Sequence, residues 1–112
     1  MTITFVSMEE LAVLKERADA EGKFLVLDVF ASWCGPCRML APKLDALASQ
    51  RDDELIIVKG DGEKVEGLVA AYPVTNLPAL FLLQNGKVLA TKEGSFASVE
   101  ALSAWVDDAM PI

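Results

Sequence analysis

Cys34 and Cys37 are the residues of this 112-residue chain best suited to chemistry, and they are its only cysteines. The chain has no histidine, which excludes a histidine base for a nucleophile and a Cys/His zinc site within one chain. Because only two residues separate the cysteines, a bond between them restricts the unfolded chain little and makes a poor structural staple. The spacing instead favours redox chemistry, in which the pair cycles between dithiol and disulfide.

The position of the pair predicts a different role for each sulfur. The cysteines follow an apolar segment, 24–30, that is typical of a strand, and they precede a segment typical of a helix. At the helix start, Cys34 lies near unpaired backbone N–H groups and the positive end of the helix dipole, which favours its thiolate. We predict that Cys34 is the nucleophile that forms a mixed disulfide with a substrate. Cys37, one turn further and expected to be more buried, is the predicted resolving thiol that attacks Cys34 and releases the reduced substrate.

Asp28 interrupts the apolar strand six residues before Cys34. Burial of a carboxylate disfavours its charged form and raises its pKa. A carboxylate with a raised pKa is a usable base, so Asp28 is the predicted acceptor of the Cys37 proton, directly or through water. The alternative is a strand-end aspartate that faces solvent.

Strands and helices alternate along most of the chain. Pro42 lies inside the second predicted helix, Gly67 weakens the third, and Asn85-Gly86 is typical of a tight hairpin turn. The order predicts one α/β domain over 1–112, with a mixed sheet and helices on both faces. The predicted strands are 2–5, 24–30, 55–59, 79–83 and 87–91, and the predicted helices begin at a Ser7 cap, after the cysteines, at Glu63 over 63–72, and at a Ser98 cap.

The charge and the apolar runs limit the partners and the location. The chain has 10 basic and 17 acidic residues and a net charge of −7, which repels nucleic acid and anionic lipid. Residues 1–11 lack the basic and apolar regions of an export signal, and the longest apolar runs are too short to span a bilayer. We therefore expect a cytoplasmic protein, or one of another reducing compartment, with no nucleic-acid or membrane partner.

The cysteine segment resembles the active site of the thioredoxin family. C-x-x-C spacing alone also occurs in zinc ribbons, but those need a second ligand pair that this chain lacks. The ten residues from Trp33 to Pro42, WCGPCRMLAP, are similar to the family's active-site segment, including its helix-kinking proline. The similarity extends over nearly the whole chain, with matches at Asp28, Lys59, Leu77-Pro78, Gly86 and Gly94.

The resemblance implies a fold and an activity. The fold is the thioredoxin fold, a central mixed sheet of about five strands with helices on both faces. The activity is that of a protein-disulfide reductase, a thiol–disulfide oxidoreductase that takes part in electron transport and cell redox homeostasis. We expect no bound cofactor and no metal, electrons from an NADPH-linked thioredoxin reductase or similar donor, disulfide-containing protein substrates, and a monomer.

The resemblance also implies roles for residues around the cysteines. Lys59 is expected to approach Asp28 and moderate its pKa, although a lysine at a strand end equally often reaches water. Sequence alone favours a trans bond before Pro78, whereas the resemblance implies a cis bond beside Cys34. In that case the backbone of Asn76 and Leu77 can pair with an extended substrate strand.

The rim of the expected contact surface comes from both sides of this segment. We expect Trp33 to offer a flat apolar contact to a substrate, although a tryptophan is more often part of the core. The other residues expected to shape the rim are Gly35, Pro36, Tyr72, Pro73 and Val74.

Several positions depart from the family's pattern. Phe30 stands where tryptophan is frequent, and Ala79 stands where threonine usually follows the proline. The segments 60–62 and 73–76 also differ, and both are expected near the docking surface. We therefore expect that substrate choice differs from that of other members.

Three alternatives remain at this point. The same fold can act as an oxidant, although an oxidant would better fit a Cys-x-His-Cys site and an export signal. The chain can also be a binding module that does not use its thiols. A dimer can share one metal between two C-x-x-C pairs.

Overall fold

The computed structural model describes residues 2–111. Within that range the chain forms five strands and four helices, and their order confirms the predicted alternation. The elements are β1 (Ile3–Phe5), α1 (Met8–Ala20), β2 (Phe24–Phe30), α2 (Gly35–Gln50), β3 (Leu55–Asp61), α3 (Leu68–Ala71), β4 (Ala79–Gln84), β5 (Lys87–Glu93) and α4 (Val99–Ala109).

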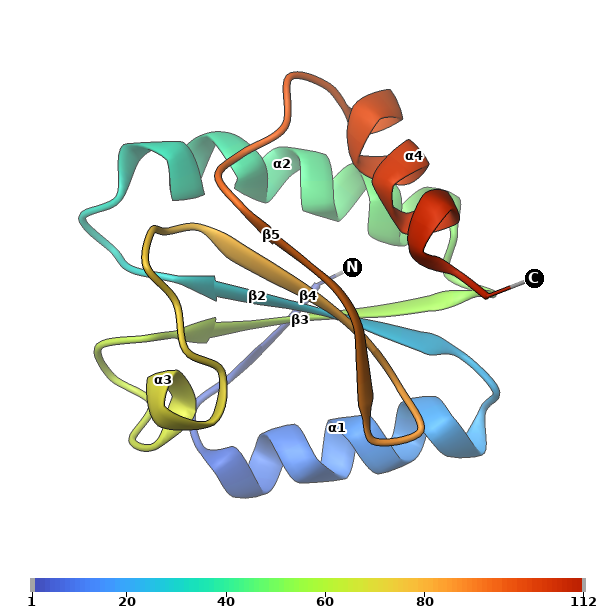
Figure 1. Cartoon of the computed structure of the whole chain (residues 1–112), viewed down its shortest axis with the longest axis horizontal. Helices are drawn as coiled ribbons and strands as arrows, with labels where there is room; N and C mark the ends of the chain where they lie inside the picture. The colour runs from blue at the N-terminus through green and yellow to red at the C-terminus, as the bar shows by residue number, and fades with distance from the viewer. Residues whose placement is uncertain (1, 112) are drawn as a thin grey trace.

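The strands form a mixed sheet in the order β1-β3-β2-β4-β5. Strands β1, β3 and β2 are parallel, while β4 is antiparallel to both β2 and β5. Figure 1 shows α1 and α3 on one face of the sheet and α2 and α4 on the other. The α/β class and the thioredoxin-like mixed sheet are therefore confirmed.

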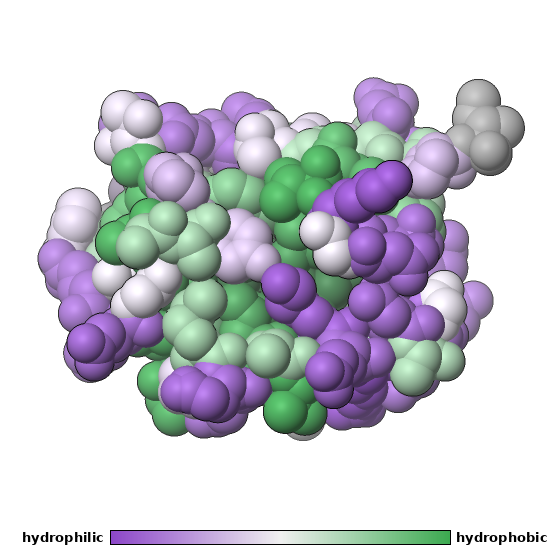
Figure 2. All heavy atoms as spheres, turned by 60° about the horizontal axis from the view of Figure 1, so that its bottom comes forward, coloured by the Kyte–Doolittle hydropathy of each residue, from purple (hydrophilic) through white to green (hydrophobic). Residues whose placement is uncertain are grey.

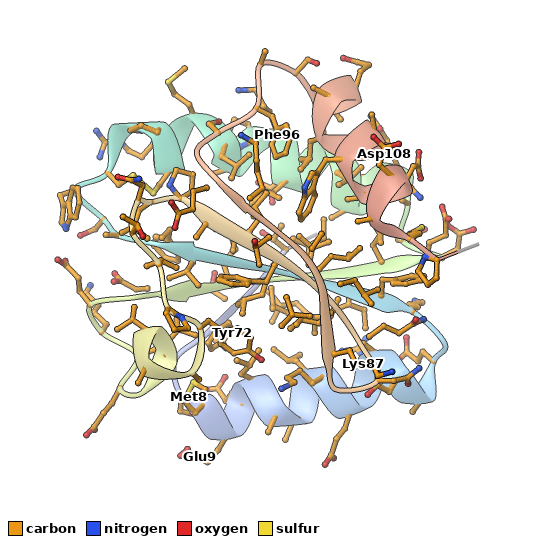
Figure 3. All side chains as sticks on the ribbon, viewed as in Figure 1. Met8, Glu9, Tyr72, Lys87, Phe96 and Asp108 are labelled. Carbon is orange, nitrogen blue, oxygen red and sulfur yellow. A yellow bond between two sulfur atoms is a disulfide. The ribbon has the colours of Figure 1, made fainter. Side chains whose placement is uncertain are left out.

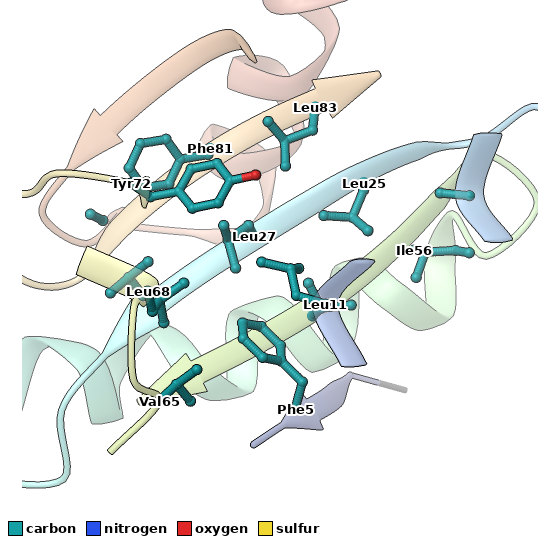
Figure 4. Packing of buried hydrophobic residues seen from close by; sticks show 14 residues of the cluster. Phe5, Leu11, Leu25, Leu27, Ile56, Val65, Leu68, Tyr72, Phe81 and Leu83 are labelled. Atoms are coloured by element: carbon teal, nitrogen blue, oxygen red, sulfur yellow. The ribbon is translucent and has the colours of Figure 1, made fainter. Parts of the chain in front are cut away.

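Strand β2 lies at the centre of this sheet, and all its residues except Asp28 are apolar. Successive side chains of a strand point to opposite faces, so Leu25, Leu27 and Val29 pack into the cluster on the α1 face (Figure 4). Val26 packs on the opposite face, into the cluster that includes residues of α2 and α4. Asp28 follows Val26 by two positions, so the alternation places its side chain on the α2 face.

The predicted helix over 63–72 is wrong in its length. Only Leu68–Ala71 is helical, and the preceding residues form turns. Gly67 has a φ of +88°, a left-handed conformation that does not continue a right-handed helix. The helix therefore begins only after Gly67, and the first half of the predicted range is not helical.

Strand β3 extends two residues beyond its predicted end, to Asp61. Gly60 pairs with Phe5 in β1, and a Cβ added at Gly60 would collide with the Phe5 ring and with Leu68. The glycine that departs from the family's apolar pattern thus leaves room for core side chains.

The predicted turn and caps are confirmed. Asn85 and Gly86 have φ angles of 51° and 77°, as a tight hairpin turn requires. The Ser7 Oγ accepts a hydrogen bond from the Glu10 N–H at 3.2 Å, and the Ser98 Oγ accepts one from the Ala101 N–H at 3.0 Å. Both serines satisfy a backbone donor that a helix start leaves free.

The surface is mixed in character. Figure 2 shows hydrophilic and hydrophobic side chains intermixed over the face turned toward the reader. In the described part of the chain, no helix combines the length and hydrophobicity needed to cross a membrane. The large hydrophobic side chains that are exposed are Val6, Val13, Trp33, Met39, Val69 and Val88.

Candidate active site

The two cysteines lie where β2 passes into α2. Strand β2 ends at Phe30, and Cys34 is the N-cap of α2, with φ −84° and ψ 111°. The Cys34 Sγ accepts a hydrogen bond from the Cys37 N–H at 3.2 Å. A free N–H group of the helix start therefore points at the Cys34 sulfur, where it stabilises developing negative charge.

Cys34 and Cys37 form a disulfide, with their Cα atoms 5.2 Å apart. The structure is thus that of the oxidised protein. The expectation that Cys37 is the more buried sulfur-bearing residue is wrong, because 3% of Cys34 and 5% of Cys37 is exposed. The two cysteines and Ala31 form one buried cluster, against which Phe30 and Leu77 pack.

A groove of about 520 Å³ lies on the Cys34 side of the disulfide. Figure 1 shows that the segment between α3 and β4 runs at the same end of the sheet as the junction of β2 and α2. That arrangement brings two distant segments together. The groove is lined by Trp33, Cys34, Gly35 and Pro36 from one segment and by Val74, Thr75, Asn76 and Leu77 from the other.

The groove contains most of the residues predicted to contact a substrate. Trp33 is 65% exposed and therefore belongs to the surface and not to the core. The Leu77–Pro78 bond is cis, as the resemblance implies. Pro78 itself is buried and does not line the groove.

The end of β5 holds the second segment of the groove. The Glu93 carboxylate accepts a hydrogen bond from the Thr75 N–H at 2.8 Å and a longer one, 3.4 Å, from the Asn76 side-chain amide. No local pattern in the sequence points to Glu93, because an acidic residue at a strand end carries no signal of contacts with residues 17 and 18 positions away.

A smaller hollow of about 120 Å³ lies on the Cys37 side. Two of its side chains are basic, Arg38 and Lys59. The Arg38 guanidinium donates a hydrogen bond to the Ser32 carbonyl oxygen at 3.0 Å. The remaining lining residues are Phe30, Ala31, Ser32, Cys37 and Ala41.

Asp28 is fully buried, and the alternation along β2 places its side chain on the face of the sheet that α2 covers. Neither of its carboxylate oxygens has a hydrogen-bond partner within residues 2–111. Burial raises the pKa of Asp28 to about 7, and the positive charge of Lys59 opposes that rise. The prediction of a buried aspartate with a raised pKa is confirmed, and the alternative of a solvent-facing residue is wrong.

Lys59 lies beside Asp28 in the register of β2 and β3. No ion pair joins the two among the residues that the structure describes. The Lys59 Nζ lies 5.2 Å from the centroid of the Phe30 ring, within the range of a cation–π contact. Lys59 therefore acts on Asp28 through its charge and not through a direct bond.

Tyr72 does not belong to the rim, contrary to expectation. It is only 8% exposed and lies in the core on the α1 side of the sheet (Figures 3 and 4). Its ring packs edge-on against Phe81, with centroids 5.2 Å apart, and its hydroxyl accepts a hydrogen bond from the Lys15 Nζ at 3.0 Å. The chain returns to the groove two residues later, at Val74.

The reactive groups of the site are the Cys34–Cys37 disulfide and one buried carboxylate, that of Asp28. Across residues 2–111 there is no group of three or more His, Cys, Asp or Glu side chains that could hold a metal ion. The arrangement can exchange thiols with a disulfide in the groove and can transfer a proton on the Cys37 side.

Comparison with known proteins supports this assignment. The family model described as Thioredoxin matches residues 6–108. The chain is 39% identical to thioredoxin-T of Drosophila melanogaster over 62% of the chain and 45% of that protein. It is 45% identical to a thioredoxin of Echinococcus granulosus over 63% of the chain and 65% of that protein. Thus the matched region spans less than two thirds of either relative.

Other matches extend over the full length. The chain is 34% identical to thioredoxin C-2 of Corynebacterium nephridii over 96% of the chain and 97% of that protein. Its fold is similar to the X-ray structure of a thioredoxin of Fasciola hepatica, with a TM-score of 0.85 and 29% identity over 97% of the chain and 100% of the other.

Proposed function

The chain belongs to the thioredoxin family, and on that premise we propose that it is a protein-disulfide reductase that works through Cys34 and Cys37. The observation that carries the proposal is the disulfide between these residues at the start of α2, with Cys34 lining a groove that contains Trp33 and Leu77. Only Cys34 of the pair lines that groove, so Cys34 is the sulfur that meets a substrate.

The first step is the attack of Cys34 on a substrate disulfide. In the reduced protein, the Cys34 thiolate forms a bond to one substrate sulfur, and the substrate's S–S bond breaks. The other substrate sulfur leaves as a thiolate and takes a proton from solvent. The Cys37 N–H, which bonds to the Cys34 sulfur, and the start of α2 favour the thiolate. Trp33, Gly35 and Pro36 contact the substrate on one side of the groove.

The second step resolves the mixed disulfide. Asp28 accepts the proton of the Cys37 thiol, directly or through water, and Cys37 attacks the Cys34 sulfur. The bond between Cys34 and the substrate breaks, and the second substrate sulfur leaves as a thiolate that takes a proton from solvent. Two electrons have passed from the protein dithiol to the substrate disulfide. Lys59 adjusts the pKa of Asp28 and so the pH at which this base works.

The substrate binds across the groove through its main chain. The backbone of Asn76 and Leu77, before the cis bond to Pro78, pairs with an extended substrate segment. Affinity from main-chain bonds suits a reductase with many substrates.

The protein is recharged by a dedicated donor. An NADPH-linked thioredoxin reductase, or a similar dithiol donor, reduces the Cys34–Cys37 disulfide, and no cofactor stays bound to the chain. We place this single-domain protein, residues 1–112, in the cytoplasm as a monomer that takes part in electron transport and redox homeostasis.

The test is reduction of insulin disulfides in the presence of NADPH and a thioredoxin reductase. We expect turnover with the wild type and background rates with Cys34→Ser and Cys37→Ser, because each variant lacks one of two required sulfurs. The Cys37→Ser variant should also accumulate a mixed disulfide with insulin, visible by mass analysis.

A second donor separates a failure of recharging from a failure of function. The assay is repeated with dithiothreitol in place of the reductase. Turnover with dithiothreitol alone would mean that the protein uses another donor. An inactive wild type under both conditions would contradict the proposal and favour a binding module that does not use its thiols.

A further inference from the structure

The end of β5 forms hydrogen bonds with the segment, Val74 to Leu77, that lines one side of the groove. The Glu93 Oε2 accepts the Thr75 N–H at 2.8 Å, and the Oε1 accepts from the Asn76 side chain at 3.4 Å. The next residue, Gly94, donates its N–H to the Pro78 carbonyl oxygen at 2.8 Å. Glu93, the last residue of β5, and the adjacent Gly94 thus hold both ends of the stretch 75–78, beside which a substrate strand would bind.

Glu93 also brings charge to a groove that otherwise has none. All eight residues that line the groove are uncharged. The hydrogen bonds from Thr75 and Asn76 lower the pKa of Glu93, so it is a carboxylate at neutral pH. These partners are neutral amides and leave its charge in place.

No basic side chain neutralises this carboxylate within the described part of the chain. The neighbouring Lys92 directs its Nζ to the backbone oxygen of Glu93 at 3.3 Å and lies 5.4 Å from the centroid of the Phe96 ring. The Lys92 ammonium group therefore bonds to the backbone of Glu93 and makes no ion pair with the Glu93 carboxylate. An exposed negative charge therefore stands beside the substrate groove.

We propose that Glu93 determines substrate choice, by holding the Thr75–Asn76 main chain in its docking position and by favouring disulfide-bearing segments with a basic residue beside the cysteine. This inference rests on the proposed reductase function. Glu93 is a positioning and specificity residue, because it contacts the wall of the groove and not the reacting sulfurs. Exposed charge pairs contribute modestly and are screened by salt, so the preference is graded.

The experiment uses three cyclic peptides with one internal disulfide, identical except for lysine, glutamine or glutamate beside one cysteine. The protein is reduced with dithiothreitol, freed of it, and mixed with each peptide, and the reaction is stopped by alkylation. Two electrons pass from Cys34 and Cys37 to the peptide, so the fraction of the protein that is oxidised at successive times gives the rate. For the wild type we expect the lysine peptide to react about fivefold faster than the glutamate peptide at low salt.

Two substitutions separate the charge from the hydrogen bonds. Glu93→Gln removes the charge but keeps an oxygen that can accept the Thr75 N–H, so the ratio of lysine to glutamate peptide should fall to about half its value or less. Glu93→Ala removes both the charge and the hydrogen-bond acceptor, so the ratio of the lysine-peptide rate to the glutamate-peptide rate should fall as much as in Glu93→Gln. The concentration of the glutamine peptide that gives half the maximal rate should rise in Glu93→Ala and not in Glu93→Gln. Glu16→Gln, an exposed site on α1, changes the net charge equally and should keep the wild-type ratio.

The outcomes are distinct. Any of three results would overturn the proposal. The wild type shows no preference among the peptides, the preference survives in Glu93→Gln, or Glu16→Gln loses the preference as fully as Glu93→Gln does. A half-saturating concentration that is unchanged in Glu93→Ala would overturn the positioning role. If the reduced protein fails to react even with the neutral bis(2-hydroxyethyl) disulfide, the reductase function itself fails, and the result is distinguishable from a loss of selectivity.

Discussion

The two sides of the Cys34–Cys37 disulfide differ far more than the two cysteines do. Both cysteines are almost fully buried. The Cys34 side is an open groove of about 520 Å³ with uncharged lining and an exposed tryptophan, while the Cys37 side is a hollow of about 120 Å³ with two basic residues. Asp28 lies buried on the same face of the sheet as α2. We therefore propose substrate contact on the Cys34 side and proton transfer on the Cys37 side, because the two sulfurs differ in their neighbours and not in their exposure.

The largest expected effect is the change of protein stability with pH, and it comes from Asp28 and not from the groove on the Cys34 side. The pKa of Asp28 is raised from 3.8 to about 7 by burial. Below pH 3.8 the carboxyl is neutral in both states, and between about 4 and 7 it ionises only in the unfolded chain. Stability should therefore fall as pH rises through this window, by up to about 4 kcal/mol, and stay low above it.

Urea denaturation of the oxidised protein at several pH values measures this effect. We expect Asp28→Asn to remove this part of the pH dependence and to be more stable than the wild type at pH 8. Trp33→Ala, on the groove side, should keep the wild-type slope. If the free energy of unfolding depends on pH equally in the wild type and in Asp28→Asn, burial does not raise the pKa of Asp28 in the folded state.

The next effect concerns the resolving step. Asp28→Asn removes the proposed base for the Cys37 proton, and a positioned base contributes at least about 100-fold, so release of a trapped substrate should slow by about that factor. Wild-type release should accelerate as pH rises through about 7, where Asp28 ionises.

The rate of release from a preformed mixed disulfide measures this step. The matched control is Asp61→Asn, because Asp61 is also buried but its carboxylate accepts the Glu63 N–H at 2.9 Å. If Asp61→Asn slows release as much as Asp28→Asn does, the effect is structural and proton transfer is not assigned to Asp28.

A smaller effect is expected on the groove side. Trp33→Ala removes an exposed aromatic contact, so the KM for a protein disulfide should rise about fivefold. The pH at which release accelerates should not move, because Trp33 lies in the groove and not beside Asp28. Met39→Ala, also an exposed apolar site near the start of α2 but outside the groove, should leave KM unchanged. A shifted pH profile in Trp33→Ala would break the division between the two sides.

The smallest effect concerns Lys59. Its positive charge lowers the pKa of Asp28, so Lys59→Met should move the acceleration of release to higher pH and slow release about threefold at pH 7. The KM for protein substrates should not change. Lys64→Met serves as the control, because Lys64 is exposed and does not line the hollow. An altered KM in Lys59→Met would place this lysine on the substrate side.

Much of the fold could be predicted because the local patterns are strong. Continuous burial along β2, the serine caps and the Asn85-Gly86 turn each depend on residues close in sequence, and the structure confirms all three. The prediction failed where a local conflict had to be decided. Apolar residues over 63–72 favoured a helix and Gly67 opposed it, and only the left-handed conformation of Gly67 shows which prevailed.

The candidate site divides in the same way. Residue types and spacing determined the thiol pair, the helix start beside Cys34 and the carboxylate in an apolar strand. The tertiary structure decided that Tyr72 is core, that Lys59 lacks a direct bond to Asp28, and that Glu93 holds Thr75. Those outcomes depend on side chains brought together from separate strands and loops. Spacing along the chain determines local geometry, but only packing determines which distant groups meet and how much water each retains.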